Sequence, residues 1–150
     1  MLKIAKMKKY NIPLRICNID GGGKHILIKA NINKTKCFLI LDTGASNSVF
    51  DPNSPAFKDT SFDTLENDNQ SSGFNSKIEN ISTGNIQSLN IGYFRSSEKN
   101  AIFTPLNYIN QLYKSLKLPH ISGIIGCDFL IKHTAIIDLS DNIMVLKKIV

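Results

Sequence analysis

The sequence predicts a mostly β fold with one or two short helices. Two short runs rich in isoleucine, "IPLRICNI" and "KHILIKANI", are joined by "DGGG", and Asp-Gly between such runs is a strong hairpin signal. A third apolar run, "TKCFLIL", ends directly before Asp42, and a single segment further on has a convincing helical period. A chain of 150 residues buries enough surface for one core, so we expect residues 1–150 to form a single domain.

The middle of the chain is predicted to contain a buried strand, a long polar loop and a hairpin. The unbroken apolar character of "TKCFLIL" predicts a strand buried on both faces. The segment 51–70 is rich in Asn, Asp, Ser and Pro, which predicts a long loop with a helical turn. After it, "SSGFNSKIENIS" and "NIQSLNIGYF" predict a hairpin with glycine at its tip and a further strand.

The helical segment is "LNYINQLYKSLKL", which ends at Pro119. Its apolar residues lie on one face and predict a core contact: Leu106, Ile109, Leu112, Tyr113 and Leu116. A second apolar run, "ISGIIGCDFLIKHTAIIDL", follows, and "NIMVLKKIV" predicts a final strand. The basic segment 1–10 is interpreted as an N-terminal extension, with a dimer strand, a tail and a propeptide remnant left open.

The charge balance favours a solvated basic surface over a nucleic-acid site. The chain has 18 Lys and Arg against 12 Asp and Glu, but the lysines are scattered or gathered at the ends without interleaved aromatic residues. No apolar run approaches the ~18 residues that a membrane helix needs, and lysines stand where a signal peptide has its apolar block. Unless an N-terminal segment has been processed away, we expect a cytoplasmic protein with no membrane partner and no nucleic-acid partner.

The cysteines and histidines predict neither a disulfide framework nor a metal site. The three cysteines are odd in number without paired spacing, and the three histidines are far apart. We therefore expect free thiols, no metal and no cofactor at these residues: Cys17, Cys37, Cys127, His25, His120 and His133.

The tripeptide at the end of "TKCFLIL" has the parts of an acid-base site. Asp42 supplies a carboxylate, Thr43 a hydroxyl that can lock neighbouring backbone, and Gly44 a sharp turn with close backbone approach. A carboxylate held where water is partly excluded is suited to proton transfer. The alternative is an ordinary turn in which Asp42 caps the loop.

A second motif favours the functional alternative. The stretch "SGIIGCDFL", Ser122 to Leu130, is followed by "TAIIDLSDNIMVL". Together with "DTGAS" after an apolar strand, it resembles the retropepsin-like aspartic proteases, single-domain relatives of retroviral protease and of one lobe of pepsin. The resemblance covers roughly residues 24–146 and implies a closed, retropepsin-like (acid protease) barrel with one or two short helices.

The resemblance also assigns roles to the residues of both motifs. It implies that Asp42, Thr43 and Gly44 are catalytic, with Thr43 tying two loops together across an interface and Gly44 letting the substrate backbone lie close. Ile124, Ile125 and Gly126 are expected to support the active loop from a strand that crosses it without touching substrate. A short helix is expected at 127–133.

One aspartate is not enough for this chemistry. Peptide hydrolysis by an aspartic protease needs one ionised carboxylate to activate water and one protonated carboxylate to bond the carbonyl oxygen. The sequence has a single Asp-Thr-Gly, and Asp128 and Asp138 are followed by Phe129 and Leu139. We therefore expect a twofold homodimer in which the two copies of Asp42 meet and hydrolyse extended polypeptides.

The residues next to the active loop are candidates for substrate binding. Ser46 and Asn47 follow the loop and are expected to hold the substrate backbone, unless they are ordinary turn residues. Because Ala45 has no hydroxyl to stabilise an ionised carboxylate, we expect activity nearer neutral pH than that of pepsin. The family covers its cleft with a glycine-tipped hairpin, for which we predict the following tip, with Gly84 as the alternative: Ser72, Gly73 and Phe74.

Two other functions compete with an aspartic endopeptidase. The first is a catalytically inactive dimeric module that grips extended peptides, although such a module has no need for a costly carboxylate at Asp42. The second is a basic nucleic-acid-binding β domain, which lacks the aromatic platforms that such binding uses. The sequence does not predict the cleavage preference.

Overall fold

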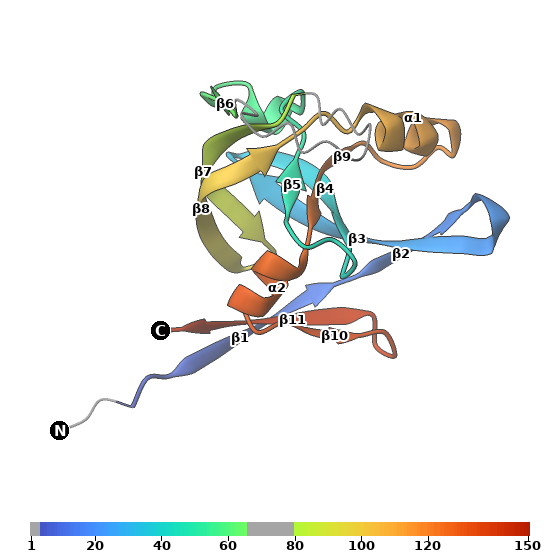
Figure 1. The fold of residues 1–150 in the computed structure, drawn as a ribbon. Helices are drawn as coiled ribbons and strands as arrows, with labels where there is room; N and C mark the ends of the chain where they lie inside the picture. The colour runs from blue at the N-terminus through green and yellow to red at the C-terminus, as the bar shows by residue number, and fades with distance from the viewer. Residues whose placement is uncertain (1–3, 66–79) are drawn as a thin grey trace, which may run out of the picture.

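The computed structural model describes residues 4–65 and 80–150. The strands are β1 (Met7–Pro13), β2 (Arg15–Ile19), β3 (Gly23–Ile32), β4 (Thr35–Leu41), β5 (Val49–Phe50), β6 (Asp63–Thr64), β7 (Ser82–Ile91), β8 (Phe94–Phe103), β9 (Ile121–Ile125), β10 (Ile136–Asp138) and β11 (Ile143–Ile149). The helices are α1 (Asn107–Ser115) and α2 (Cys127–Lys132), and the 3-10 turns are η1 (Asp20–Gly22) and η2 (Pro55–Phe57). Figure 1 shows these elements around a central barrel.

The barrel is closed by a short pairing between two strands that are distant in sequence. Neighbouring strands follow the order β3-β4-β9-β5-β8-β7, and β7 then pairs with β3. This last pairing joins Asn31 to Asn90 and Ile32 to Leu89. The result is a closed six-stranded barrel with two short helices, so the predicted fold class is confirmed.

The hairpin predicted at "DGGG" is confirmed. Strands β2 and β3 pair from Arg15 with Leu27 to Ile19 with Gly23. Between them, Gly21 and Gly22 have positive φ angles of 79° and 82°, which side chains other than glycine rarely adopt. The hairpin therefore depends on glycine for its reversal.

The two apolar runs lie side by side in the barrel wall. Strand β4 pairs in parallel with β9, with Leu41 beside Ile125. Leu39 and Ile125 are fully buried, as expected for strands covered on both faces. Parallel strands end at the same edge of a sheet, so the residues that follow β4 and β9 are brought together.

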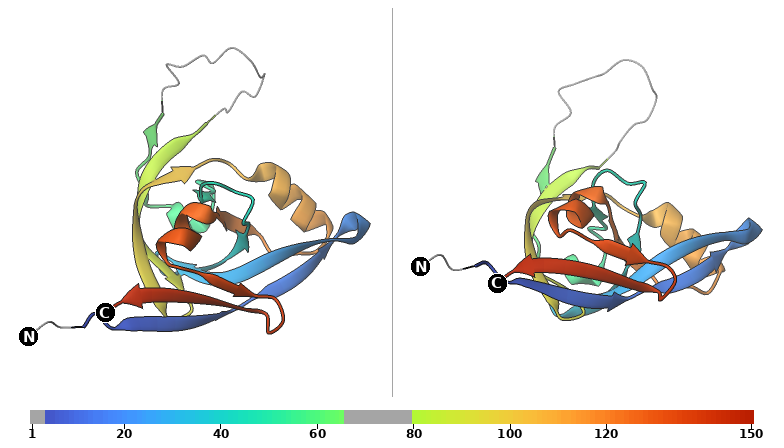
Figure 2. Two further views of the ribbon diagram at one scale, coloured as in Figure 1. Left: turned by 60° about the horizontal axis from the view of Figure 1, so that its bottom comes forward. Right: turned by 90° about the horizontal axis from the view of Figure 1, so that it is seen from below.

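A second, smaller sheet lies below the barrel in Figure 1 and has the strand order β1-β11-β10. Residues 7–10 of the predicted N-terminal extension belong to β1, which pairs with β11 from Met7–Ile149 to Pro13–Ile143. Figure 2 shows α2 above this sheet, and Phe129 and Leu130 share one apolar core with Met144 and Leu146. The small sheet therefore supports α2 from below.

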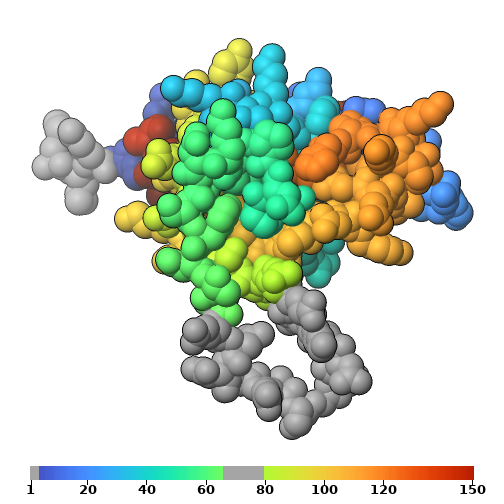
Figure 3. Space-filling view, turned by 90° about the horizontal axis from the view of Figure 1, so that it is seen from above, coloured from blue at the N-terminus to red at the C-terminus, as the bar shows by residue number. Residues whose placement is uncertain are grey.

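The upper face carries the other helix. Figure 3 shows the segment around η2, in green, beside the segment around α1, in orange. The helix predicted before Pro119 is confirmed as α1, and the helix predicted at 127–133 is confirmed as α2. The buried Tyr113 of α1 packs in a second core cluster with Leu27, Ile40 and Ile121.

Three details of the middle segment differ from the sequence prediction. The run "NIQSLNIGYF" is not one strand, because a turn at Gly92, with φ 59°, separates β7 from β8. Strand β8 was missed, since "FRSSEKN" has no apolar alternation. Gly84 is not a hairpin tip, because it lies inside β7 opposite Ala101. The other predicted tip, Ser72 to Phe74, lies outside the described residues.

Candidate active site

Asp42 stands at the edge where β4 and β9 end. Its backbone N–H donates to the carbonyl of Ile125 at 3.0 Å, which ties the start of the loop to β9. Its carboxylate Oδ1 accepts a hydrogen bond of 2.8 Å from the N–H of Gly44, and Ala45 N–H donates to the Asp42 carbonyl at 3.2 Å. The loop is thus a tight turn that presents a carboxylate from the rim of the barrel.

The carboxylate of Asp42 is exposed in the single chain. The prediction that water is partly excluded from this carboxylate is not met in a single copy of the chain, where Asp42 is exposed. Thr43 and Gly44 are exposed as well. Any desolvation of this site has to come from a molecule that covers the rim.

The first residues of α2 hold the far side of the loop. The N–H of Cys127 donates to the Ala45 carbonyl at 2.8 Å, and the N–H of Asp128 donates to the Ser46 carbonyl at 3.2 Å. The Cys127 thiol also donates to the Thr43 carbonyl at 3.0 Å. Three carbonyls of the loop backbone are therefore fixed by two residues of one helix.

Ser48 and Asp128 form a partly buried link that was not predicted from the sequence. Asp128 Oδ1 accepts from the Ser48 N–H at 2.9 Å and from the Ser48 hydroxyl at 2.7 Å. The Ser48 hydroxyl in turn accepts from the Gly126 N–H at 2.9 Å. Asp128 was considered only as a second catalytic acid, and its place two residues after Gly126 was the available signal for a supporting role.

Gly126 allows the close crossing of strand and loop. A Cβ at this position would lie 2.7 Å from the Ala45 carbonyl oxygen and 2.9 Å from the Asn47 carbonyl oxygen. Both contacts are with backbone, which cannot swing aside. A Cβ on Gly44 would lie 3.1 Å from Asp42 Oδ1, so this glycine also leaves room for the carboxylate.

The structure brings together most of the predicted site residues. The two motif segments, 42–47 and 124–126, lie in contact through the hydrogen bonds of Asp42 to Ile125 and of Cys127 to Ala45. Ile125 is fully buried, while Ile124 is partly buried against the second core cluster. Ala45 is partly buried, and Ser46 and Asn47 are exposed beside the carboxylate. Their catalytic, substrate-binding and supporting roles stay predictions.

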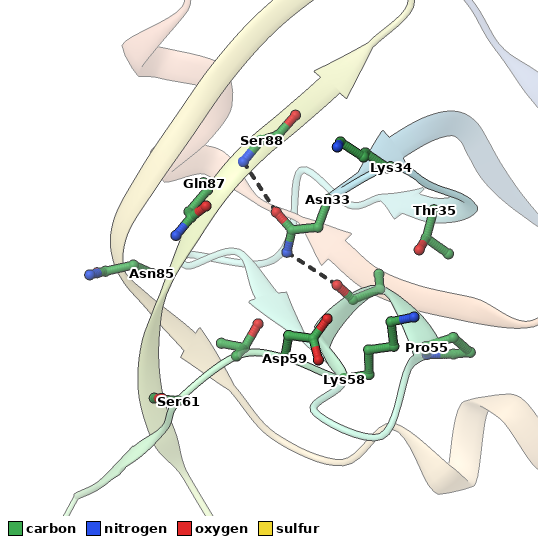
Figure 4. A pocket seen from close by; sticks show the side chains of 12 residues that line it. Asn33, Lys34, Thr35, Pro55, Lys58, Asp59, Ser61, Asn85, Gln87 and Ser88 are labelled. Atoms are coloured by element: carbon green, nitrogen blue, oxygen red, sulfur yellow. Dashed lines mark hydrogen bonds between the residues drawn. The ribbon is translucent and has the colours of Figure 1, made fainter.

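A larger pocket than those beside the Asp42 loop lies elsewhere. It has a volume of about 500 Å³ and is lined by residues at the start of β4, by η2 and by β7. Because β4 rises roughly 3.3 Å per residue over its length, this pocket is on the order of 20 Å from Asp42. Figure 4 shows Asn33 within it, donating to the Ala56 carbonyl at 3.1 Å and accepting from the Ser88 N–H at 3.2 Å. Asn33 therefore holds the β3–β4 turn in place.

Burial keeps two further reactive side chains, those of Cys37 and Tyr113, in their protonated forms. All three cysteines are free, and burial raises the pKa of the Cys37 thiol to about 11, which keeps it protonated and unreactive at neutral pH. Burial also raises the pKa of Tyr113 to about 12, and its hydroxyl lies 2.6 Å from His25 Nδ1. In the described ranges, no three His, Cys, Asp or Glu side chains are grouped to hold a metal ion. No helix found in residues 4–65 and 80–150 is long and apolar enough to cross a bilayer.

Comparisons with known proteins give likenesses of structure. No protein-family model and no curated protein sequence matches the chain. The structure is similar to that of a retropepsin-like aspartic protease from Rickettsia conorii, with 16% identity over 98% of this chain and 95% of that chain, at a TM-score of 0.48. It is also similar to the retroviral protease-like domain of Ddi1 from Leishmania major, with 19% identity over 81% of this chain and 92% of that domain, at a TM-score of 0.47.

The chain resembles retropepsin-like aspartic proteases. Because the identities are low and the TM-scores are below 0.5, these similarities assign no reaction, substrate or assembly to this chain. The features of this chain that bear on its chemistry are the exposed carboxylate of Asp42 and the hydrogen bonds that fix its loop.

Proposed function

We propose that the chain is an aspartic endopeptidase that works as a homodimer. The observation that carries the proposal is the Asp42 loop, in which Gly44 N–H orients one carboxylate oxygen and α2 fixes the backbone on the far side. Such fixing is what a positioned acid-base group requires. An ordinary turn has no comparable need for four hydrogen bonds with a distant strand and helix.

The second carboxylate comes from a second copy of the chain. The exposed Asp42 lies on the rim of the barrel, where a twofold axis brings two copies of the same loop together. Two carboxylates held close together share one proton, which is the behaviour established for aspartic protease dyads in general. The partner loop and the substrate would also remove water from the rim, which raises the strength of every electrostatic interaction there.

The proposed reaction divides its steps between the two carboxylates. The ionised carboxylate takes a proton from a water molecule as the water oxygen attacks the scissile carbonyl carbon. The protonated carboxylate donates to the carbonyl oxygen and stabilises the negative charge that develops there. A proton then passes to the leaving nitrogen as the C–N bond breaks. Thr43 ties the two loops together, and Ser46 and Asn47 hold the substrate backbone.

The test compares the purified protein with Asp42→Asn on a library of extended peptides. The wild type should cleave a subset of them, and the variant should lose at least about a thousandfold in rate, since the general base is gone. Equal turnover by both proteins contradicts the proposal. Peptide binding by both without any cleavage supports the alternative, an inactive peptide-binding module.

A further inference from the structure

A second hollow in the described structure adjoins the candidate active site. It lies between α2 and β8, has a volume of about 220 Å³ and begins at Asn47, in the segment predicted to hold substrate backbone. At about 30 Å³ per water molecule, it has room for roughly seven waters, which is the space of one long side chain. Its lining joins polar, apolar and charged groups, with two carboxylates and two lysines among them: Ser48, Glu98, Lys99, Asp128, Phe129 and Lys132.

Glu98, which lines this hollow, has one carboxylate oxygen without a partner. Its Oε1 is buried and has no hydrogen-bond partner among the residues of the described structure. Its Oε2 lies 3.7 Å from Lys132 Nζ, and the Lys132 side chain is 61% exposed against 20% for Glu98. An ion pair of that length with a mostly exposed lysine is weak, so Lys132 is easily displaced.

The other carboxylate of the hollow, Asp128, uses one of its oxygens to hold the loop. Asp128 Oδ1 accepts from Ser48 twice and also from the Phe129 N–H at 2.8 Å. Asp128 therefore belongs to the scaffold of the loop. Burial removes water from Glu98 Oε1, and no hydrogen bond from the described residues replaces it. Such a buried polar atom needs an explanation.

We propose that the hollow between α2 and β8 is a specificity pocket that receives a basic side chain, arginine or lysine, of the bound polypeptide, with Glu98 as its counter-charge. This inference rests on the proposed function, because the polypeptide is the one bound at the Asp42 loop. A guanidinium or ammonium group supplies the donors that Glu98 Oε1 lacks and takes the place of Lys132 at Oε2.

The charge state of Glu98 agrees with this assignment. Burial raises the pKa of the Glu98 carboxyl, Asp128 raises it further, and Lys132 offsets only part of the effect. An arriving cation stabilises the ionised form and recovers part of the cost of burial. In a twofold dimer the pocket occurs once on each side of the cleft, so substrates with basic residues on both sides of the cleaved bond are favoured.

The test uses two substitutions at one ion pair that have opposite effects on specificity. Peptide pairs differ by arginine against citrulline, its neutral analogue, at one position scanned along the sequence. Glu98→Gln should lower the arginine preference in kcat/KM at one position roughly tenfold, the size of a charge-assisted hydrogen bond. Lys132→Gln should raise the same preference, because it removes the competing cation. Asp59→Asn, an exposed carboxylate at the distant pocket, is the control for net charge.

The outcomes separate this inference from the proposed function. A purely structural ion pair makes both substitutions act in the same direction, and that result overturns the inference while cleavage by the wild type upholds the endopeptidase. Equal arginine and citrulline preference in the wild type overturns it too. If the wild type cleaves nothing, its affinity for the same peptide pairs is measured by fluorescence anisotropy. An arginine preference that Glu98→Gln removes then upholds the pocket, and its absence overturns the pocket.

Discussion

The two helices differ in how completely the buried polar groups around them are hydrogen-bonded. On the α1 side, Asn110 donates to the Ile121 carbonyl at 3.0 Å, accepts from the Ile121 N–H at 2.7 Å and reaches Asp51 Oδ2 at 3.4 Å. The buried hydroxyls of Ser54 and Ser122 bond each other at 2.8 Å. On the α2 side, Glu98 Oε1 and His133 Nε2 are buried without a partner among the described residues.

We interpret the fully bonded groups beside α1 as scaffold and the unpartnered groups beside α2 as part of a binding site. On the α1 side, the hydrogen bonds of Asn110 fix the helix against β9. The buried polar groups described there all have partners. An unsatisfied buried group costs about 1–3 kcal/mol, and natural proteins keep few of them. Both unsatisfied atoms lie beside the helix that holds the Asp42 loop, which is where a polypeptide is proposed to bind.

The largest effect is expected from Gly126→Ala, which disrupts the close crossing between the residue before α2 and the Asp42 loop. The added Cβ would meet the Ala45 carbonyl oxygen at 2.7 Å, so strand and loop have to separate. We expect a loss of about 2–3 kcal/mol in the free energy of unfolding and a fall of more than roughly a hundredfold in cleavage rate.

Chemical denaturation and the peptide assay check this prediction. Gly23→Ala is the matched control, because its Cβ would find the nearest atom at 3.9 Å and its φ is not positive. Equal stability of the two variants would show that the crossing at Gly126 is not tight.

The α1 side is tested by Asn110→Ala. The substitution leaves the Ile121 N–H and carbonyl without their partners, which should cost about 2 kcal/mol in unfolding free energy. Gln111→Ala, an exposed change on the same helix, should stay within about 0.5 kcal/mol. If Asn110→Ala loses no more unfolding free energy than Gln111→Ala, the scaffold role of the α1 side is contradicted.

The contrast between the helices also marks what the sequence can predict. Strand β4, the Asp42 turn and α2 were predicted because their signals are local: an apolar run, Asp-Thr-Gly, and Gly126 before a short apolar segment. The bond from Ser48 to Asp128 joins residues far apart in the chain. The place of Asp128 after Gly126 could have indicated a supporting role, but no local pattern pairs it with Ser48. The same holds for β8, whose residues are polar because one face of the strand meets solvent.

A smaller effect is expected at His133. It packs edge-on against Phe94 and Phe129, with ring centroids 4.8 and 4.5 Å away. Burial lowers the pKa of His133, helped by Lys132 and Lys148, so the folded chain holds it neutral.

The sign of the pH dependence follows from that lowered pKa. As the pH falls below 6.5, the usual value for histidine, the unfolded chain binds a proton that the folded chain does not, and stability decreases. His133→Phe removes this contribution, so its advantage over the wild type in unfolding free energy should grow from pH 7 to pH 5. An advantage that is the same at both values would contradict the buried, neutral histidine.

The smallest effect is expected from Ala45→Ser. A serine hydroxyl at this position can donate to the ionised carboxylate of the dyad and stabilise its charged form, which lowers the pH of optimal cleavage by about one unit or less. The pH profile of kcat/KM checks it. An optimum that rises or does not move would count against the placement of residue 45 beside the reacting carboxylate.

The central claim is that two copies of Asp42 form one site, and mixing experiments test it most directly. Wild type and Asp42→Asn are unfolded, mixed at fixed total concentration and refolded together, and cleavage is measured against the wild-type fraction. A site shared by two chains predicts activity that follows the square of that fraction, about one quarter in an equal mixture. Activity in simple proportion to the wild-type fraction, about one half in that mixture, would mean that one chain works alone and would contradict the account.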